Sequence, residues 1–209
     1  MGPMDVLEML KAGNERFVHG RPLVYNYPRQ VALTAAGQSP SALVLTCMDS
    51  RVAPEIIFNQ GIGELFTVRV AGNIISPEIL GSMEYACGHA GTKLIVVLGH
   101  THCGAVTGAC MHFRHPEQHS SIPEPGLEAV FADLRPAVEQ ADHEEGAENE
   151  ETFIEHTAVD NVLLDIRRIR AESPELAALE HAGHIAIVGG VYDVQTGRVV
   201  FLAAEKPQH

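Results

Sequence analysis

TKLIVVLGH, residues 92–100, is the most strongly apolar run of this chain. A short run of this kind is expected of a strand that is buried on both faces of a sheet. SALVLTC (41–47) has the same character, and ELFTVRVAG (64–72) is rich in β-branched residues and typical of a strand. The segments between these strands, 53–61 and 76–91, predict helices, since each has proline near its start and glycine at its end. Strands that alternate with helices over such short distances indicate a parallel sheet covered on both faces.

Both ends of the chain add to this central pattern. An amphipathic helix is predicted over 5–18, and the stretch 20–30 that follows it is irregular and rich in turn formers. Near the other end, 184–194 and 198–203 are strand-like and flank QTG, which indicates a hairpin that closes the sheet edge. The predicted fold is therefore α/β: a mostly parallel central sheet with helices on both faces, a C-terminal antiparallel edge hairpin and an N-terminal helical arm.

Residues 111–151 break the alternation of strands and helices. A loop opens this segment, a helical pattern interrupted by Pro136 follows, and a charge run typical of solvated surface ends it. A long helix is predicted after it over 151–173. Because 209 residues are long for one α/β domain and short for two, we expect one domain over 1–209, with an N-terminal helical arm (1–35) and a variable insertion (111–151).

The charge balance limits the partners of the protein. Fourteen Lys and Arg against 27 Asp and Glu give a net charge of −13, which argues against non-specific binding to nucleic acid or to an anionic membrane. Neither membrane insertion nor a secretory signal is expected, because no run approaches about 18 uncharged apolar residues and the N-terminal pattern carries charges throughout. Four cysteines in a chain of this length do not suggest a disulfide framework, so a reducing, cytoplasmic location is expected.

Two thiols and one imidazole stand at or just beyond predicted strand ends. Cys47 ends one strand, His100 ends another, and Cys103 follows one turn later. Ligands bind beyond the carboxyl ends of the strands in such sheets, so neighbouring strands would bring these side chains together. Two Cys and one His are a known zinc set that leaves the fourth position open, as in catalytic sites. From spacing alone this zinc reading is about even with small buried cysteines and a loop that binds no metal.

A second element next to Cys47 favours the metal reading. Asp49 and Arg51 place an acid and a base two residues apart, just past the end of the strand, where both can lie on one side of an extended chain. Such pairs are common on surfaces and usually have no function. An acid–base pair beside a candidate metal ligand, however, favours a functional role.

Long stretches of the sequence resemble the β-class carbonic anhydrases. The resemblance is carried by CMDSRV, GELFTVRVAGN, GSMEYAC, LIVVLGHTHCGAV, NVLLDIRRIR and IAIVGGVYDVQTGRV. It covers most of the chain outside roughly 111–150 and the first thirty residues. The combination of Cys-x-Asp-x-Arg with a distant His-x-x-Cys is far more specific than either half alone.

The resemblance implies a role for each matching residue. Cys47, His100 and Cys103 would bind one zinc ion per chain, and Asp49 and Arg51 would form the family's catalytic dyad. The substrate pocket would be formed by Gln38, Phe66, Ala71, Tyr85 and Gly104. The family also implies at least a homodimer, with the N-terminal helix reaching over the neighbour and the zinc site near the subunit boundary. Gln38 and the aromatic residues would then come from different chains.

The implied reaction is the reversible hydration of carbon dioxide to bicarbonate and a proton through a zinc-bound hydroxide. Two thiolates cancel the charge of the ion and make it a weaker acid than one held by three histidines. Asp49 would compensate by accepting a hydrogen bond from the hydroxide, and Arg51 would hold Asp49 in place. The Gln38 amide would stabilise the developing oxyanion. In some members the equivalent aspartate leaves its arginine and binds zinc; the sequence leaves this open.

Three other functions are compatible with parts of the sequence. The same site could hydrolyse carbonyl sulfide or carbon disulfide, or the chain could be a catalytically silent, bicarbonate-sensing metal protein. The acid–base dyad argues against the silent protein, since a purely structural site has no need of it. A nucleotide-binding α/β domain is disfavoured, because the first strand runs into CMDSR rather than a glycine-rich phosphate loop.

Overall fold

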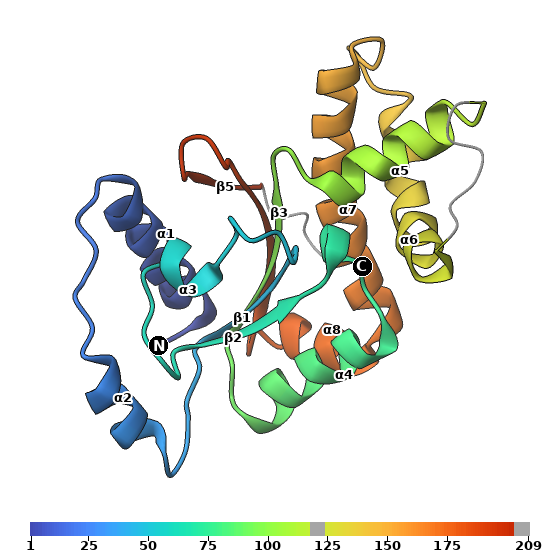
Figure 1. Cartoon of the computed structure of the whole chain (residues 1–209). Coiled ribbons are helices and arrows are strands. Elements are labelled where there is room, and N and C mark those ends of the chain that lie inside the picture. Colours follow the sequence, from blue (N-terminus) through green and yellow to red (C-terminus); the bar gives the residue numbers. More distant parts are fainter. Residues whose placement is uncertain (118–123, 203–209) are drawn as a thin grey trace.

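The computed structural model describes residues 1–117 and 124–202. Its centre is a five-stranded sheet in the order β2-β1-β3-β4-β5 (Figure 1). The strands are β1 (Ala42–Thr46), β2 (Leu65–Arg69), β3 (Leu94–His100), β4 (Ala186–Tyr192) and β5 (Val199–Phe201). All neighbouring pairs are parallel except β4 and β5, which form the antiparallel edge hairpin that the QTG signal predicts.

Helices cover both faces of the sheet, so the expected fold class is confirmed. Alternate residues of β1 and β3 pack against α4 (Pro77–Glu84), α7 (Glu150–Glu172) and α8 (Pro174–His181) on one face. The other residues of these strands pack against α1 (Pro3–Val18) and α3 (Pro54–Ile57) on the opposite face. Both inner strands are buried throughout, which explains their uninterrupted apolar sequence.

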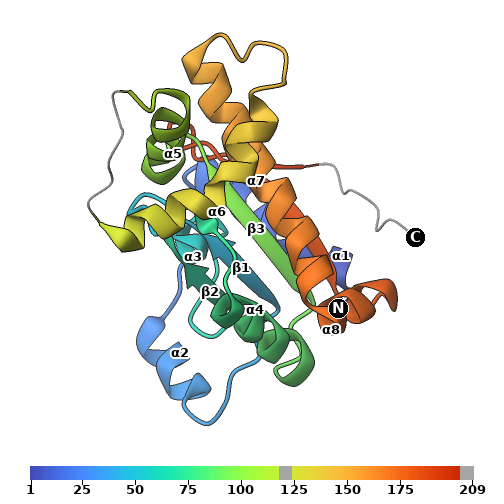
Figure 2. The same ribbon diagram turned by 90° about the vertical axis from the view of Figure 1, so that its right-hand side faces the viewer.

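A third apolar cluster lies beyond the carboxyl ends of the strands. It is built by α5 (Gly104–Arg114), α6 (Pro125–Ala141) and the first half of α7, which stand together at the same end of the molecule (Figures 1 and 2). Cys47 and Cys103 belong to this cluster. The segment that breaks the sequence pattern therefore packs beside the predicted metal residues.

The structure corrects several expectations about single elements. The stretch 20–30, expected to be irregular, contains the start of α2 (Tyr27–Thr34), which has no buried residue and stands away from the sheet (Figures 1 and 2). The helix expected over 76–91 divides into α4 and a π-helical turn, η2 (Tyr85–His89). Pro136 does not interrupt α6, because it lies on the exposed face, where water can solvate the carbonyl that loses its partner.

Between β2 and α4 the chain forms a short 3₁₀ turn, η1 (Ala71–Asn73), at the carboxyl end of the sheet. No helix within 1–117 or 124–202 is long and apolar enough to cross a membrane.

Candidate metal centre

The carboxyl ends of β1 and β3 bring three candidate ligands together. The two strands are neighbours in register, and the hydroxyl of Thr46 donates to the carbonyl of Leu98 at 2.7 Å, which holds their ends side by side. Cys47 directly follows β1, and His100 ends β3. Cys103 caps the N-terminus of α5 on the chain that turns back from β3.

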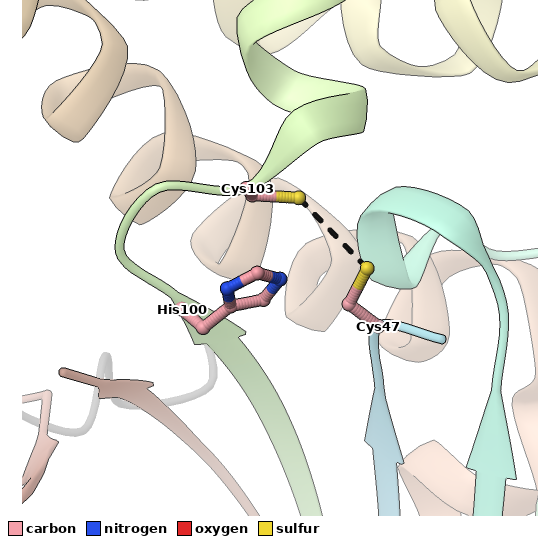
Figure 3. A group of neighbouring side chains, drawn as sticks. All are labelled: Cys47, His100 and Cys103. Atoms are coloured by element: carbon pink, nitrogen blue, oxygen red, sulfur yellow. Dashed lines mark hydrogen bonds between the residues drawn. The ribbon is translucent and has the colours of Figure 1, made fainter. Parts of the chain in front are cut away.

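The ligand atoms of Cys47, His100 and Cys103 all lie within 4.8 Å of one another, and the three residues are buried. Their sulfurs are 3.9 Å apart, with the imidazole pointing toward them (Figure 3). Two thiolates bound to one tetrahedral zinc at about 2.3 Å each would lie about 3.8 Å apart. The separation of the sulfurs therefore fits a shared zinc ion.

The imidazole of His100 is oriented as a metal ligand would be. Its Nδ1 donates to the carbonyl of Thr101 at 2.9 Å, which leaves the lone pair on Nε2. Nε2 is buried and has no hydrogen-bond partner among the described residues. A buried acceptor without a partner is costly, and a cation between the two sulfurs would satisfy it.

The two thiols share their protons unequally. A hydrogen bond from the Cys103 thiol lowers the pKa of Cys47 to about 4, while that hydrogen bond and burial raise the pKa of Cys103. Backbone N–H groups also stabilise negative charge on both sulfurs: those of Asp49 and Gly72 at Cys47, and those at the start of α5 at Cys103. The group is thus built to hold thiolates, the form that binds metal.

Asp49 and Arg51 form a two-point ion pair beside this group. Nε of Arg51 donates to Oδ1 of Asp49 at 2.9 Å, and Nη2 donates to Oδ2 at 2.7 Å. The backbone N–H of Arg51 also donates to Oδ1 at 2.9 Å. These hydrogen bonds hold the pKa of Asp49 well below its usual range. The carboxylate faces the arginine and does not belong to the metal group of the described residues.

Comparison with known proteins decides the family. A family model described as carbonic anhydrase matches residues 42–199. The fold is similar to that of the β-carbonic anhydrase CafA of Aspergillus fumigatus, with a TM-score of 0.73 and 26% identity over 98% of this chain and 92% of that one. The chain belongs to the β-carbonic anhydrase family.

Curated relatives agree with this assignment. The chain is 39% identical to carbonic anhydrase 2 of Mycobacterium tuberculosis over 95% of its own length and 92% of that protein. It is 36% identical to a carbonic anhydrase of Mycolicibacterium smegmatis over 94% and 92%. The protein is therefore a lyase that catalyses the zinc-dependent reversible hydration of carbon dioxide, and neither the sulfur-compound hydrolase nor the silent metal protein is favoured.

Not all the expected substrate residues of this carbonic anhydrase lie near its metal group. Gly104 begins α5 next to Cys103, and Ala71 precedes the Gly72 N–H that contacts Cys47. Gln38 is exposed and precedes β1, so it lies at the amino edge of the sheet, the edge opposite to Cys47.

The two aromatic residues that are expected in the substrate pocket also lie apart from the metal group of their own chain. Phe66 and Tyr85 line a cavity of about 430 Å³ between β2 and α4, to which none of the three metal-group residues contributes. Tyr85 is 60% exposed. Phe66 lies on β2, the edge strand of the sheet, and Tyr85 lies in η2, directly after α4.

Arg69 is outside the predicted set of metal, dyad and substrate residues, but it contacts the segment that carries Cys47 and Asp49. This arginine ends β2, and its guanidinium donates to the backbone carbonyls of Cys47 and Asp49. It therefore holds the segment that carries both the first thiol and the dyad. Its signal was present: a basic residue at the carboxyl end of a strand faces the same edge as the metal residues.

Proposed function

We propose that Cys47, His100 and Cys103 bind one zinc ion per chain and that Asp49 and Arg51 orient the water that attacks carbon dioxide. The observation that carries this proposal is the buried Nε2 of His100, which has no partner among the described residues and points toward two sulfurs 3.9 Å apart. When bound there, zinc supplies the Lewis acidity that makes water nucleophilic near neutral pH.

The Asp49–Arg51 dyad orients the attacking water and does not bind the metal. Asp49, as a carboxylate, accepts a hydrogen bond from the attacking water and turns a lone pair of that water toward the carbon of the substrate. Arg51 donates hydrogen bonds to both oxygens of Asp49, so the carboxylate stays turned away from the metal residues. Asp49 would therefore not be a ligand of a bound zinc ion, which Cys47, His100 and Cys103 would hold.

The substrate pocket is completed by a second copy of the chain. Gln38 precedes β1 and so lies at the opposite end of the strand from its own Cys47, and Phe66 and Tyr85 line a cavity beside β2, the edge strand. In a homodimer these three residues would face the metal of the partner, next to its Ala71 and Gly104. The Gln38 amide would then donate to the oxygen on which negative charge develops, and bicarbonate would leave from the same pocket.

The N-terminal arm supports this assembly. Apolar side chains on and before α2 are largely exposed: Leu23, Val24, Tyr27, Val31 and Leu33. Exposed apolar side chains gathered in one short segment are typical of an interface. We further propose a cytoplasmic location, since all four cysteines are free thiols and two of them must remain reduced to bind metal.

The test combines metal analysis with stopped-flow hydration of carbon dioxide, across neutral to alkaline pH, for the wild type and for Asp49→Ala. We expect one zinc per chain in both proteins and a hydration rate that falls about 10²- to 10³-fold in the variant, as for other groups that stabilise a transition state. Loss of zinc together with activity would instead make Asp49 a structural residue. Wild-type turnover in the variant would refute its role.

A further inference from the structure

His102 stands between two residues of the metal group and has an uncommon backbone conformation. Its φ is +54°, in the left-handed region, which is unfavourable for a residue with a β-carbon. The residue is also exposed, so burial of the imidazole does not hold this conformation. Contacts from neighbouring segments must therefore hold it.

The conformation aims the carbonyl of His102 at the dyad. This carbonyl accepts a hydrogen bond at 3.2 Å from Nη2 of Arg51, the same nitrogen that donates to Oδ2 of Asp49. Half of the Arg51 side chain is exposed, and within the described residues its guanidinium hydrogen bonds go to Asp49 and to this carbonyl. The position of the carbonyl thus helps to set where the guanidinium lies.

The turn between β4 and β5 contacts the loop 101–103. The N–H of Val194 donates to Oγ1 of Thr101 at 3.1 Å. The N–H of Thr101 donates to the carbonyl of Tyr192, the last residue of β4, at 2.9 Å. Nε2 of Gln195 donates to Nε2 of His102 at 3.0 Å. Two consecutive residues of the loop are therefore tied to one turn.

The turn is itself well anchored. Asp193 accepts hydrogen bonds at 2.7 Å from the N–H of Gln195 and from the hydroxyl of Thr196, which closes the turn locally. Asn14 of α1 is 4% exposed and donates to the carbonyl of Gly197 at 2.9 Å. The turn can therefore act as a rigid support for the loop.

We propose that Thr101 and Gln195 are positioning residues. They join the β4–β5 turn to the loop 101–103 and hold the His102 carbonyl where it directs Arg51 onto Asp49. The inference rests on the role proposed above for the Asp49–Arg51 pair, and it adds the part of the fold that sets the geometry of that pair.

The test uses Thr101→Val, which keeps the shape of the side chain and removes the acceptor, and Gln195→Ala. In the zinc-loaded protein we expect each to lower kcat/KM for hydration about 2- to 10-fold, the range for one hydrogen bond. Solvent exchange of the Arg51 Nε–H, followed by ¹⁵N NMR and assigned with Arg51→Lys, should accelerate. Arg198→Ala is the matched control, because Arg198 lies beside the same turn and pairs with Glu15; it should change neither quantity.

The variant His102→Gly tests whether Gln195 acts on Arg51 through His102. His102→Gly permits the left-handed conformation without a side chain, so Gln195→Ala should cause no further change in that protein. A further loss there would overturn the proposal, as would wild-type Arg51 exchange in Thr101→Val and Gln195→Ala. Arg51→Ala keeps this outcome separate from the proposed function. Full hydration activity in Arg51→Ala would refute the role of the dyad. The exchange of the Arg51 Nε–H in Thr101→Val and Gln195→Ala would still report whether the turn supports Arg51.

Discussion

At the scale of single residues, one proton on His100 decides whether the buried group can hold a cation. Because Nδ1 donates to the carbonyl of Thr101, Nε2 is an acceptor, and it points toward two thiols. Each side chain of the group supplies one donor atom, and the set is complete without any other Cys, His, Asp or Glu of the described residues. The loss of any one of the three would therefore leave only two side chains to hold a zinc ion.

Cys103→Ala should weaken zinc binding by more than the roughly 10- to 100-fold that loss of an outer hydrogen-bond partner costs, and hydration should fall to background. Metal analysis after dialysis against a chelator measures the loss. Cys110→Ala is the matched control: Cys110 is equally buried, but its thiol donates to Thr157. It should keep its zinc. Equal zinc content in both variants would remove Cys103 from the metal site.

Asp160, on α7, is a buried carboxyl outside the metal site. It is 3% exposed, it accepts a hydrogen bond from Gln140, and its Oδ2 has no partner among the described residues. Burial, together with the nearby charge of Glu144, raises its pKa from 3.8 to about 6. The neutral carboxyl therefore contributes stability that is fully present below about pH 4 and is lost as the pH rises through 6.

Asp160→Asn should therefore stabilise the protein at pH 7.5 and much less at pH 4.5. After allowance for solvent screening we expect a gain of about 1 to 2 kcal/mol, or about 2 to 8 °C in Tm. Differential scanning calorimetry of the zinc-loaded protein at both pH values measures it. The exposed Asp142→Asn should change Tm by no more than about 2 °C. A gain that does not depend on pH would contradict this explanation.

At the scale of elements, α1 approaches the end of α3 closely enough to exclude a β-carbon. A Cβ added at Gly13 would lie 1.9 Å from the carbonyl oxygen of Phe58, just after α3. The apolar residues Val6, Leu7 and Leu10 of the same helix are buried against this face of the sheet. Gly13 thus sets the distance at which the helix packs.

Gly13→Ala should lower Tm by about 2 to 10 °C, because overpacking of about 1 to 3 kcal/mol displaces α1. Gly126→Ala, near the start of α6, is the control, since nothing lies within 4 Å of its added Cβ; its Tm should stay within about 2 °C. Thermal denaturation followed by circular dichroism compares the two variants. An unchanged Tm in Gly13→Ala would show that α1 can shift at no cost.

At the scale of the whole molecule, the residues of the proposed active site lie at two opposite ends of the strands. The metal group and the dyad lie at the carboxyl edge, whereas Gln38 lies at the amino edge. Because these ends are opposite, Gln38 cannot reach the metal group of its own chain. Activity in the proposed homodimer therefore depends on association.

The double substitution Val31→Asp and Leu33→Asp on α2 should dissociate the dimer, because it places charge on an exposed apolar surface that we propose to be the interface. We expect sedimentation velocity to show monomers, zinc to be retained, and hydration to fall about 10²-fold or more through loss of the partner's Gln38. Val200→Asp is the control. Val200 is an exposed apolar residue too (62% exposed), but it lies on β5, the edge strand at the other side of the sheet from β2. Full activity in a monomer would contradict the shared site.

Local sequence patterns predicted most of the fold. The apolar runs 41–47 and 92–100 became β1 and β3, and the hairpin signal QTG became the β4–β5 turn. The helix α2 was missed although a signal was present: Asn26 caps it, and Pro28 stands in its first turn. Its apolar residues are exposed, so it lacks the amphipathic pattern that predicted the helix over 5–18. The helix α8 was not predicted either.

The sequence by itself determined which residues stand at the ends of the strands, because burial and strand periodicity act between near neighbours. It placed Cys47, His100 and Cys103 at the right edge and identified Asp49 and Arg51 as a pair. Only the tertiary structure decided that β1 lies beside β3, that Nε2 of His100 is the free nitrogen, and that the β4–β5 turn contacts the loop 101–103. The neighbouring strands and the contact of the turn depend on the order of strands that are far apart in the chain, which no local pattern encodes. The free nitrogen of His100 depends on the orientation of its imidazole, which donates to the carbonyl of the adjacent Thr101.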